Sequence, residues 1–355
     1  MGLQIIKPDT NIDFIGFKKI AFIISAVIIL AGLGSLVIKG GPKYGIDFAG
    51  GMIVQVKLDK NTDVRDLKDA MSGVKLPGLV VQTFGLEDDN EYLIRTSTSE
   101  ISSQDVRTQV SEALGKNLNG TNFEIQRLEM VGPKVGADLR TKALEALFYA
   151  VLIIAVYISG RFEQRWTVAA IMAAVLGGSI YGIGLIGLDM GFLIIAALLI
   201  TVGMCWYLKL NYALGAVVAL IHDVMITVGI FSILGKEFDL TIIAALLTII
   251  GYSLNDTIIV FDRIRENSIG QKNSDSFGAV INKSINQTLS RTIMTSLTTL
   301  LVVACLYVLG GSVIHDFALA LLIGVVVGTY SSIFVASPIL LGFGPGTIIE
   351  KEVEA

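Results

Sequence analysis

The sequence holds few charges, few histidines and few cysteines. Asp, Glu, Lys and Arg make up 16% of its 355 residues, whereas soluble domains contain about 25%. Two cysteines, Cys205 and Cys305, lie within apolar runs and only two histidines accompany them, so we expect neither a disulfide framework nor a metal site. The phosphate-binding pattern G-x-x-x-x-G-K-[ST] is absent. We therefore expect no cofactor, and energy for any work must come from an ion gradient or a partner.

Long apolar runs are abundant in the sequence, which has 53% hydrophobic residues and a mean hydropathy of +0.71. A helix needs roughly 20 apolar residues to cross a bilayer. The first run exceeds the roughly 7–15 residues of a signal peptide, so we interpret it as a retained anchor. Gly324 and Gly328 form a G-x-x-x-G pattern, which predicts a packing face inside a bundle. The runs predict an α-helical polytopic membrane bundle of about eight spans, at residues 20–38, 143–159, 167–188, 191–208, 212–234, 240–261, 292–310 and 312–341.

Residues 39–140 differ from the rest, because they hold nearly half of the acidic residues and nearly half of the basic ones in less than a third of the chain. Thr62 is the expected N-cap of the first helix in this region. The order βαββαβ predicts one inserted α+β domain of the ferredoxin-like type. Its strands are expected at residues 52–58, 79–84, 91–96 and 121–131, and its helices at 62–72 and 102–118. The expected division is 1–38 for the N-terminus and first span, 39–140 for this domain, 141–345 for a seven-helix bundle and 346–355 for the tail.

Basic residues are distributed unequally between the two ends of the predicted spans. With the N-terminus inside, the short outer loops carry one basic residue, Lys236, beside Asp189, Glu237, Asp239 and Asp316. Basic residues next to spans favour the cytoplasmic side. The inner segments carry Lys7, Lys18, Lys19, Arg161, Arg165, Lys209, Arg263, Arg265, Lys272, Lys283, Arg291 and Lys351. We therefore expect both termini in the cytoplasm and the inserted domain outside it.

Four polar side chains lie within membrane-length runs: His222, Asp223, Asn255 and Asp256. An ionisable group in hydrocarbon costs at least roughly 2.5–3.5 kcal/mol on insertion scales, which makes it a functional candidate. Asp223 lies about 18 Å into its span, near the midplane. His222 points about 100° away around the helix, so we expect the two side chains to face different partners. The structural alternative is that Asp223 forms an interhelical hydrogen bond and His222 simply packs.

Asp256 is the strongest candidate for proton handling. Ser253 and Thr257 place hydroxyl groups near its carboxyl, and Arg291 opens the next span on the same, cytoplasmic side. A carboxyl between a desolvating environment and a nearby arginine can load and release a proton near neutral pH. The alternative for Arg291 is a charge at a helix end that sets the topology.

The glycines at the start of the inserted domain have two interpretations. Gly45, Gly50 and Gly51 permit sharp turns with positive φ where the chain leaves the membrane, and Asp47 between them can form a local hydrogen bond. They are either a hinge that lets the domain move or a turn that seats it on the bilayer.

Three segments resemble motifs of the SecD/SecF family of protein-export membrane proteins, and of its SecF branch in particular. They are YGIDFAGG at residues 44–51, RFEQR at 161–165 and GYSLNDTIIVFDRIREN at 251–267. Membrane-embedded Asp and Arg residues are linked to proton flow in this family. The resemblance therefore implies a proton relay, for which the candidates are Asp256, Arg291, Asp223, Asn255 and His222.

The resemblance also implies a function, partners and a location. A SecF-type subunit sits in the bacterial inner membrane and uses the proton gradient with SecD to promote polypeptide export through the SecYEG channel; it is not an enzyme. The implied partners are SecD, SecYEG, the translocating polypeptide and membrane lipid, with YajC as a further candidate and no nucleic acid. Coupling to protons or to sodium is left open by the sequence.

The chain departs from the family pattern at one place. SecF-type proteins have six spans, and their RFE-x-R turn leads directly into the span with the His-Asp pair. Here residues 167–210 intervene and form two extra predicted spans. We expect an accessory hairpin at the edge of the bundle, which leaves the topology downstream unchanged because an even number of spans was added.

Three alternative functions stay open. A proton-driven exporter of small molecules or lipids, of the resistance-nodulation-division type, would share the ancestry. A non-conducting assembly subunit would carry inert polar residues. A membrane-embedded hydrolase would use His222 and Asp223, although no nucleophile motif accompanies that pair.

Overall fold

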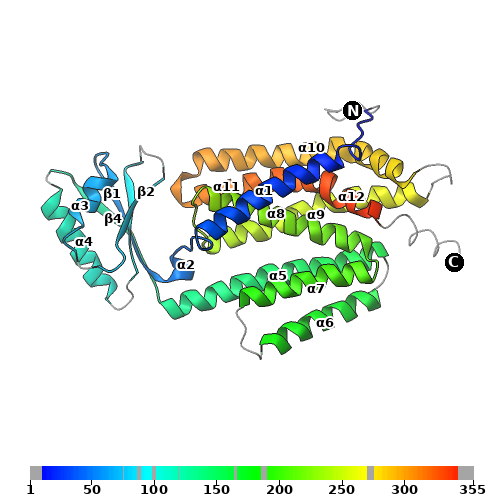
Figure 1. Cartoon of the computed structure of the whole chain (residues 1–355). Helices are drawn as coiled ribbons and strands as arrows, with labels where there is room; N and C mark the ends of the chain where they lie inside the picture. The colour runs from blue at the N-terminus through cyan, green and yellow to red at the C-terminus, as the bar shows by residue number, and fades with distance from the viewer. Residues whose placement is uncertain are drawn as a thin grey trace.

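The computed structural model describes residues 10–342 apart from 75, 86–88, 98–100, 119, 164–165, 185–189 and 270–275. The chain forms a small sheet domain, built from residues 51–131, at one end of a bundle of long helices (Figure 1). The first long helix begins at the end of the bundle away from the sheet, and the last helical turns end there too.

The sheet domain has the predicted βαββαβ order. Its strands β1 (Gly51–Leu58), β2 (Val80–Phe84), β3 (Glu91–Thr96) and β4 (Phe123–Val131) alternate with the helices α3 (Val64–Ala70) and α4 (Ser103–Asn117). The strand order is β2-β3-β1-β4, and each neighbouring pair is antiparallel. This arrangement confirms the ferredoxin-like prediction. The first helix begins later than expected, because the carboxylate of Asp63, rather than Thr62, accepts a hydrogen bond from the Arg65 amide at 2.8 Å.

Strand β1 is buried on both faces, which places the sheet domain directly against the bundle. One face meets α3 and α4 through a core that includes Met52, Val54, Val56, Leu67, Val106 and Leu114. On the opposite face Ile53 packs with Leu93 and with Ile46. Ile46 belongs to α2 (Ile46–Ala49), a single helical turn wedged between the sheet and the bundle.

Six helices in the described part of the chain are long and apolar enough to cross a membrane. They are α1 (Lys18–Ile38), α5 (Pro133–Glu163), α8 (Asn211–Ile233), α9 (Leu240–Ile269), α10 (Phe277–Leu309) and α11 (Gly311–Ser331), which continues through the π-helix η2 (Ser332–Ala336), α12 (Ser337–Ile339) and η3 (Leu340–Gly342). The other two predicted spans are also helical, as α6 (Trp166–Gly184) and α7 (Met190–Tyr207), but their described apolar stretches are shorter, at Trp166–Gly178 and Ile195–Tyr207. All eight apolar runs therefore form helices, and in six of them the described residues alone reach membrane length.

Small residues bring the long helices close together. A Cβ atom on Gly32 of α1 would lie 2.6 Å from the Cα of Gly229 in α8, so these two helices touch backbone to backbone. Gly324 and Gly328 of α11 are in close contact with the side chains of Ile249 and Ser253 of α9. The predicted G-x-x-x-G packing face is thus an internal contact of the bundle, as expected for helices that associate by close packing.

Helices α6 and α7 lie at one edge of the bundle (Figure 1). α6 packs on α5 and α7, and α7 packs on α5 and α8. The two ends of this hairpin meet, because the Glu163 carboxylate at the end of α5 accepts a hydrogen bond from the Tyr212 amide at 3.0 Å. The ring of Phe162 also stacks on the ring of Tyr212 at 5.1 Å. The chain therefore returns, after residues 166–207, to the point from which it left.

Candidate functional site

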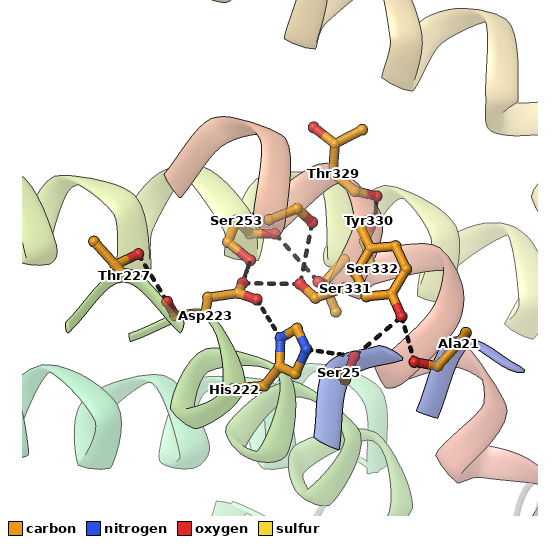
Figure 2. A network of polar contacts seen from close by, with 12 residues as sticks. Ala21, Ser25, His222, Asp223, Thr227, Ser253, Thr329, Tyr330, Ser331 and Ser332 are labelled. Carbon is orange, nitrogen blue, oxygen red and sulfur yellow. Dashed lines mark hydrogen bonds and ion pairs between the residues drawn. The ribbon is translucent and has the colours of Figure 1, made fainter. Parts of the chain in front are cut away.

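Asp223 is the centre of a buried polar network in the middle of the bundle (Figure 2). The ring nitrogen Nδ1 of His222 lies 2.8 Å from its Oδ1 atom. Its Oδ2 atom accepts hydrogen bonds from Ser253 of α9 at 2.6 Å and from Ser331 of α11 at 2.8 Å. Both carboxylate oxygens therefore have partners, which is what a buried carboxylate requires. Asp223 joins α8 to α9 and α11.

His222 continues the network toward α1. Its Nε2 atom lies 2.8 Å from the hydroxyl of Ser25, which is 3.0 Å from the hydroxyl of Tyr330. Tyr330 donates its single proton to the carbonyl of Ala21 at 2.7 Å. His222 and Asp223 thus face different helices, as expected, but the His222 ring also turns back onto its neighbour, which the angle around the helix did not predict.

The number of available protons determines the direction of each hydrogen bond in this network. The Tyr330 proton goes to Ala21, so Ser25 must donate to Tyr330, and His222 must then donate to Ser25 through Nε2. Nδ1 of His222 still faces Oδ1 of Asp223 at 2.8 Å, and such a contact needs a proton between the two atoms. The contact between Nδ1 and Oδ1 is therefore the hydrogen bond that joins His222 to Asp223 within the bundle.

Ser25, His222 and Asp223 have the connectivity of a hydrolytic triad, but the hydrogen bonds run in the wrong direction for one. In a triad the histidine accepts the proton of the serine hydroxyl. Here Ser25 donates to Tyr330 instead, and Ser25 is 4% exposed. The arrangement does not activate a nucleophile.

Asp256 forms a second buried site, between α9, α10 and α11. Its Oδ2 atom accepts a hydrogen bond from Ser296 of α10 at 3.3 Å, and Ser296 contacts Thr329 of α11 at 2.7 Å. Its Oδ1 atom is buried and has no direct hydrogen-bond partner among the described residues, while the Thr295 hydroxyl also interacts with the carboxylate. The carboxylate of Asp256 is therefore held less tightly than that of Asp223, whose two serine donors lie at 2.6 and 2.8 Å.

The other sequence candidates occupy different places from those expected. Ser253 donates to Asp223 rather than to Asp256, and the Thr257 hydroxyl bonds to the Ser253 carbonyl of its own helix at 3.2 Å. Arg291 lies on the exposed face of α10, where it acts electrostatically on Asp256 but forms no ion pair with it in the described structure. Asn255 also faces the exterior of the single chain. Asp256 is thus surrounded by α10 and α11 hydroxyls, not by its own helix.

Sequence reasoning missed the contribution of α11. Thr329 lies at the Asp256 site and Ser331 at the Asp223 site, two residues along the same helix. The hydroxyl of Ser332 donates to the Thr329 carbonyl at 3.0 Å, and the π-helix η2 begins at Ser332. A π-turn inside a helix is often found at functional sites. The polar run Thr329–Tyr330–Ser331–Ser332 within an apolar span was the available signal.

The glycine segment before the sheet is tightly packed. Gly50 and Gly51 have φ angles of 75° and 121°, which glycine adopts readily, whereas Gly45 has an ordinary φ of −70°. A Cβ atom on Gly51 would lie 2.4 Å from the Thr96 carbonyl oxygen. Asp47 does not bond locally as expected: its carboxylate accepts a hydrogen bond from the Leu240 amide at 3.0 Å and so caps the start of α9.

Comparison with known proteins places these features in a family. The sequence matches the family described as "Protein export membrane protein SecD/SecF, C-terminal" over residues 110–205 and 189–345, and the "SecD/SecF GG Motif" over 34–62. It is 42% identical over 348 residues to a protein translocase subunit SecF from Magnetococcus marinus, covering 97% of this chain and 96% of the relative. The corresponding SecF of Calditerrivibrio nitroreducens is 40% identical over 337 residues, covering 94% and 95% of the two chains.

The chain belongs to the SecD/SecF family of protein-export membrane proteins. Its fold resembles the crystal structure of SecDF, a translocon-associated membrane protein from Thermus thermophilus, with a TM-score of 0.68 and 30% identity. That likeness covers 96% of this chain but only 39% of the SecDF chain. A second SecDF structure, in a form named super-membrane-facing, gives a TM-score of 0.53. The match to the family's GG motif includes Gly50 and Gly51, which both have positive φ angles.

Proposed function

We propose that this protein is the SecF-type subunit of a bacterial Sec machinery, that it pairs with SecD in the inner membrane, and that it promotes polypeptide export through SecYEG. The names of its relatives and their match over nearly the whole chain support this role. YajC is a further partner in the proposal. The sheet domain lies outside the cytoplasm and both termini lie inside, because the basic residues flank one side of the spans.

The orientation has a direct test. Single cysteines at Lys236 and at Val313, introduced into a chain lacking Cys205 and Cys305, should react with a membrane-impermeant maleimide from the outside of intact cells. Cysteines at Lys209 and Glu266, both exposed, should react only after the membrane is opened. Outside labelling at Lys209 would overturn the proposed topology.

In the proposed mechanism Asp256 is the group that takes up and releases a proton. The observation that carries this assignment is the contrast between the two buried carboxylates. Asp223 has close partners on both oxygens, whereas Asp256 accepts a direct bond of 3.3 Å at Oδ2 and has no direct partner at Oδ1 among the described residues. A proton can occupy that position without displacing an existing hydrogen bond. Arg291, which acts electrostatically on Asp256, completes the pathway with groups supplied by SecD.

Helix α9 connects this proton site to the sheet domain. Asp256 lies in its middle, and its first turn is held by the carboxylates of Asp47 and Asp239. The loop before it binds the sheet domain through Glu237. A proton that crosses 100 mV supplies about 2.3 kcal/mol, which is enough to shift an equilibrium between two positions of the domain about fiftyfold.

Asp256→Asn tests the proposal, because the amide keeps the shape of the side chain but removes the titratable proton. The variant should insert and copurify with SecD in normal yield while the export that depends on the proton gradient is lost. Asp256→Glu should keep part of that export. Asp262→Asn is the matched control, since this carboxylate lies on the same helix and pairs with Arg161 at 3.0 Å instead. If the Asp256→Asn variant keeps the full export that an uncoupler abolishes, Asp256 does not carry the proton. That result would favour a non-conducting subunit.

A further inference from the structure

An apolar cavity of about 290 Å³ lies between α5, α8 and α9, at the end of the bundle next to the sheet domain. This volume is at the lower limit of the roughly 300–1,000 Å³ that small-ligand pockets measure, which suits a slender chain of methylene groups. Half-buried aliphatic side chains form its walls, among them Leu147 of α5, Val224 of α8 and Ile243 of α9. Leu198 of α7 adds to the lining, so the edge hairpin contributes one wall.

A single cation lies among the residues that line this cavity. Arg140 is on α5, three residues before the predicted apolar run begins at Ala143. Its guanidinium carbon lies 5.3 Å from the centre of the Tyr44 ring, which holds the side chain at the rim. Arg140 is half-buried and forms no ion pair with any residue that the structure describes. An arginine and a tyrosine at the border of an apolar run are typical of the membrane interface.

We propose that this cavity binds one acyl chain of a membrane phospholipid and that Arg140 binds the phosphate of the same molecule. The guanidinium group can donate two parallel hydrogen bonds to phosphate oxygens. From Arg140 to Val151, at the inner end of the α5 wall, the helix rises about 16 Å. That length is about half of the roughly 30 Å hydrocarbon thickness, which is the depth of one leaflet.

An acyl chain suits the cavity better than a polypeptide does. Arg140 and Tyr44 are the two polar residues among those that line it. An extended peptide would leave its backbone N–H and C=O groups without partners against such a wall, which costs several kcal/mol per group in hydrocarbon. A chain of methylene groups has no such requirement. The site is independent of Asp256, so it stands whether or not Asp256 carries protons.

The proposal can be tested on the full chain in a bilayer that contains a phospholipid with a photoactivatable diazirine on one acyl chain. The protein is first exchanged into detergent with excess unlabelled lipid and only then irradiated, after which mass spectrometry locates the attached lipid. A diazirine at the methyl end should label the peptides that contain Val151 and Leu220, and one near the headgroup should label the peptide that contains Tyr44. Lipid held in the cavity should survive the exchange, whereas lipid beside Leu301, an exposed residue of α10, should be lost.

Two variants make the result specific. Arg140→Gln, at the rim, should reduce the retained label about tenfold, the effect of losing one charge-assisted hydrogen bond. Val224→Trp should abolish it by filling the cavity. Lys142→Gln is the matched control, because this exposed lysine two residues away pairs with Glu145 at 2.8 Å and should leave the label unchanged. If the label is retained equally beside Val224 and Leu301, the protein binds lipid only at its surface, and the proposal is wrong. A photoreactive side chain at position 224 that captures a translocating polypeptide, and no lipid, would also overturn the proposal.

Discussion

Glu237, in the loop that joins α8 to α9, forms an ion pair with Arg95 of strand β3. The same carboxylate lies 3.0 Å from Lys43, just before α2. The side chains of Glu237 and Arg95 are only 14% and 18% exposed. Lys236, the preceding residue, pairs with Asp316 of α11 at 2.7 Å. One short loop of the bundle thus holds the sheet domain, the segment that leads into it and the helix that carries Ser331.

We expect Glu237→Gln to loosen the sheet domain from the bundle. An exposed ion pair contributes about 0–1 kcal/mol to stability, and breaking a buried ion pair costs roughly 3–5 kcal/mol. The free-energy cost of breaking this half-buried pair should lie between these two ranges. Distances between spin labels at Val80 and Leu309, both exposed, should spread over a wider range in the variant. The exchange Arg95→Glu with Glu237→Arg should narrow the range again. If the distance distribution does not change in Glu237→Gln, the apolar contacts of α2 alone are enough to hold the sheet domain on the bundle.

Asp223→Ala should destabilise the bundle strongly. The substitution leaves Ser253, Ser331 and His222 without their acceptor, and each buried unpaired group costs about 1–3 kcal/mol. We expect a lower yield of folded protein and a lower melting temperature in detergent. Thr227→Val is the control, because this buried hydroxyl bonds only to the carbonyl of Asp223 in its own helix. Equal melting temperatures for the two variants would contradict a structural role for Asp223.

Much of the fold follows from the sequence because the periodicities are strong. The alternation in residues 52–58 and the helical spacing in 102–118 come from local constraints, and the strands and helices of the sheet domain form within two residues of the expected bounds. The eight apolar runs are long enough to be recognised one at a time. The N-cap at Asp63 was missed because two capping residues stand side by side at 62–63, and local sequence does not choose between them.

The candidate site was less predictable, because its hydrogen bonds join helices that are far apart in the chain. Asp47 has a local turn as an alternative, yet it caps α9 at Leu240. Ser253 lies three residues from Asp256, yet it bonds to Asp223 on the neighbouring helix. Both choices depend on which helices become neighbours, and no single-sequence pattern contains that information. Ser25 and Tyr330 were missed for the same reason.

Asp239 predicts a dependence of stability on pH. Burial raises the pKa of this carboxyl above its usual 3.8, with a smaller contribution from the nearby charge of Asp47. The folded protein therefore binds the proton more tightly than the unfolded chain, so stability falls as the pH rises through the raised folded pKa. Asp239→Asn keeps an oxygen that can accept from the Ile242 amide, a bond of 2.9 Å. Its melting temperature should exceed that of the unsubstituted protein at neutral pH, and the two should converge as the pH falls toward 3.8.

A second substitution at this position separates charge from capping. Asp239→Ala loses the acceptor for the Ile242 amide at the start of α9, a loss that costs about 1 kcal/mol for a typical N-cap. It should therefore melt below Asp239→Asn at every pH. If the asparagine variant is the less stable one at neutral pH, the charge of Asp239 on the helix start outweighs its burial.

Removing the edge hairpin should leave a protein that still inserts. Joining RFEQR directly to Tyr212 requires little rearrangement, because the Glu163 carboxylate already lies 3.0 Å from the Tyr212 amide. We expect the shortened chain to copurify with SecD, with a lower melting temperature because the buried faces of α5 and α8 against α7 become exposed. Loss of membrane insertion would instead make α6 and α7 part of the core bundle.

The contact between Gly32 and Gly229 has a consequence for how the chain is made. A protein emerges from the ribosome with its N-terminal end first, so α1 enters the membrane long before α8 can meet it. Asp223 then arrives with α8, ahead of Ser253 on α9 and well ahead of Ser331 on α11. Until synthesis reaches α11, its carboxylate lacks the Ser331 donor and Ser25 lacks Tyr330. A chain interrupted before that point therefore carries an incompletely satisfied acid in the bilayer, which destabilises it relative to the finished protein.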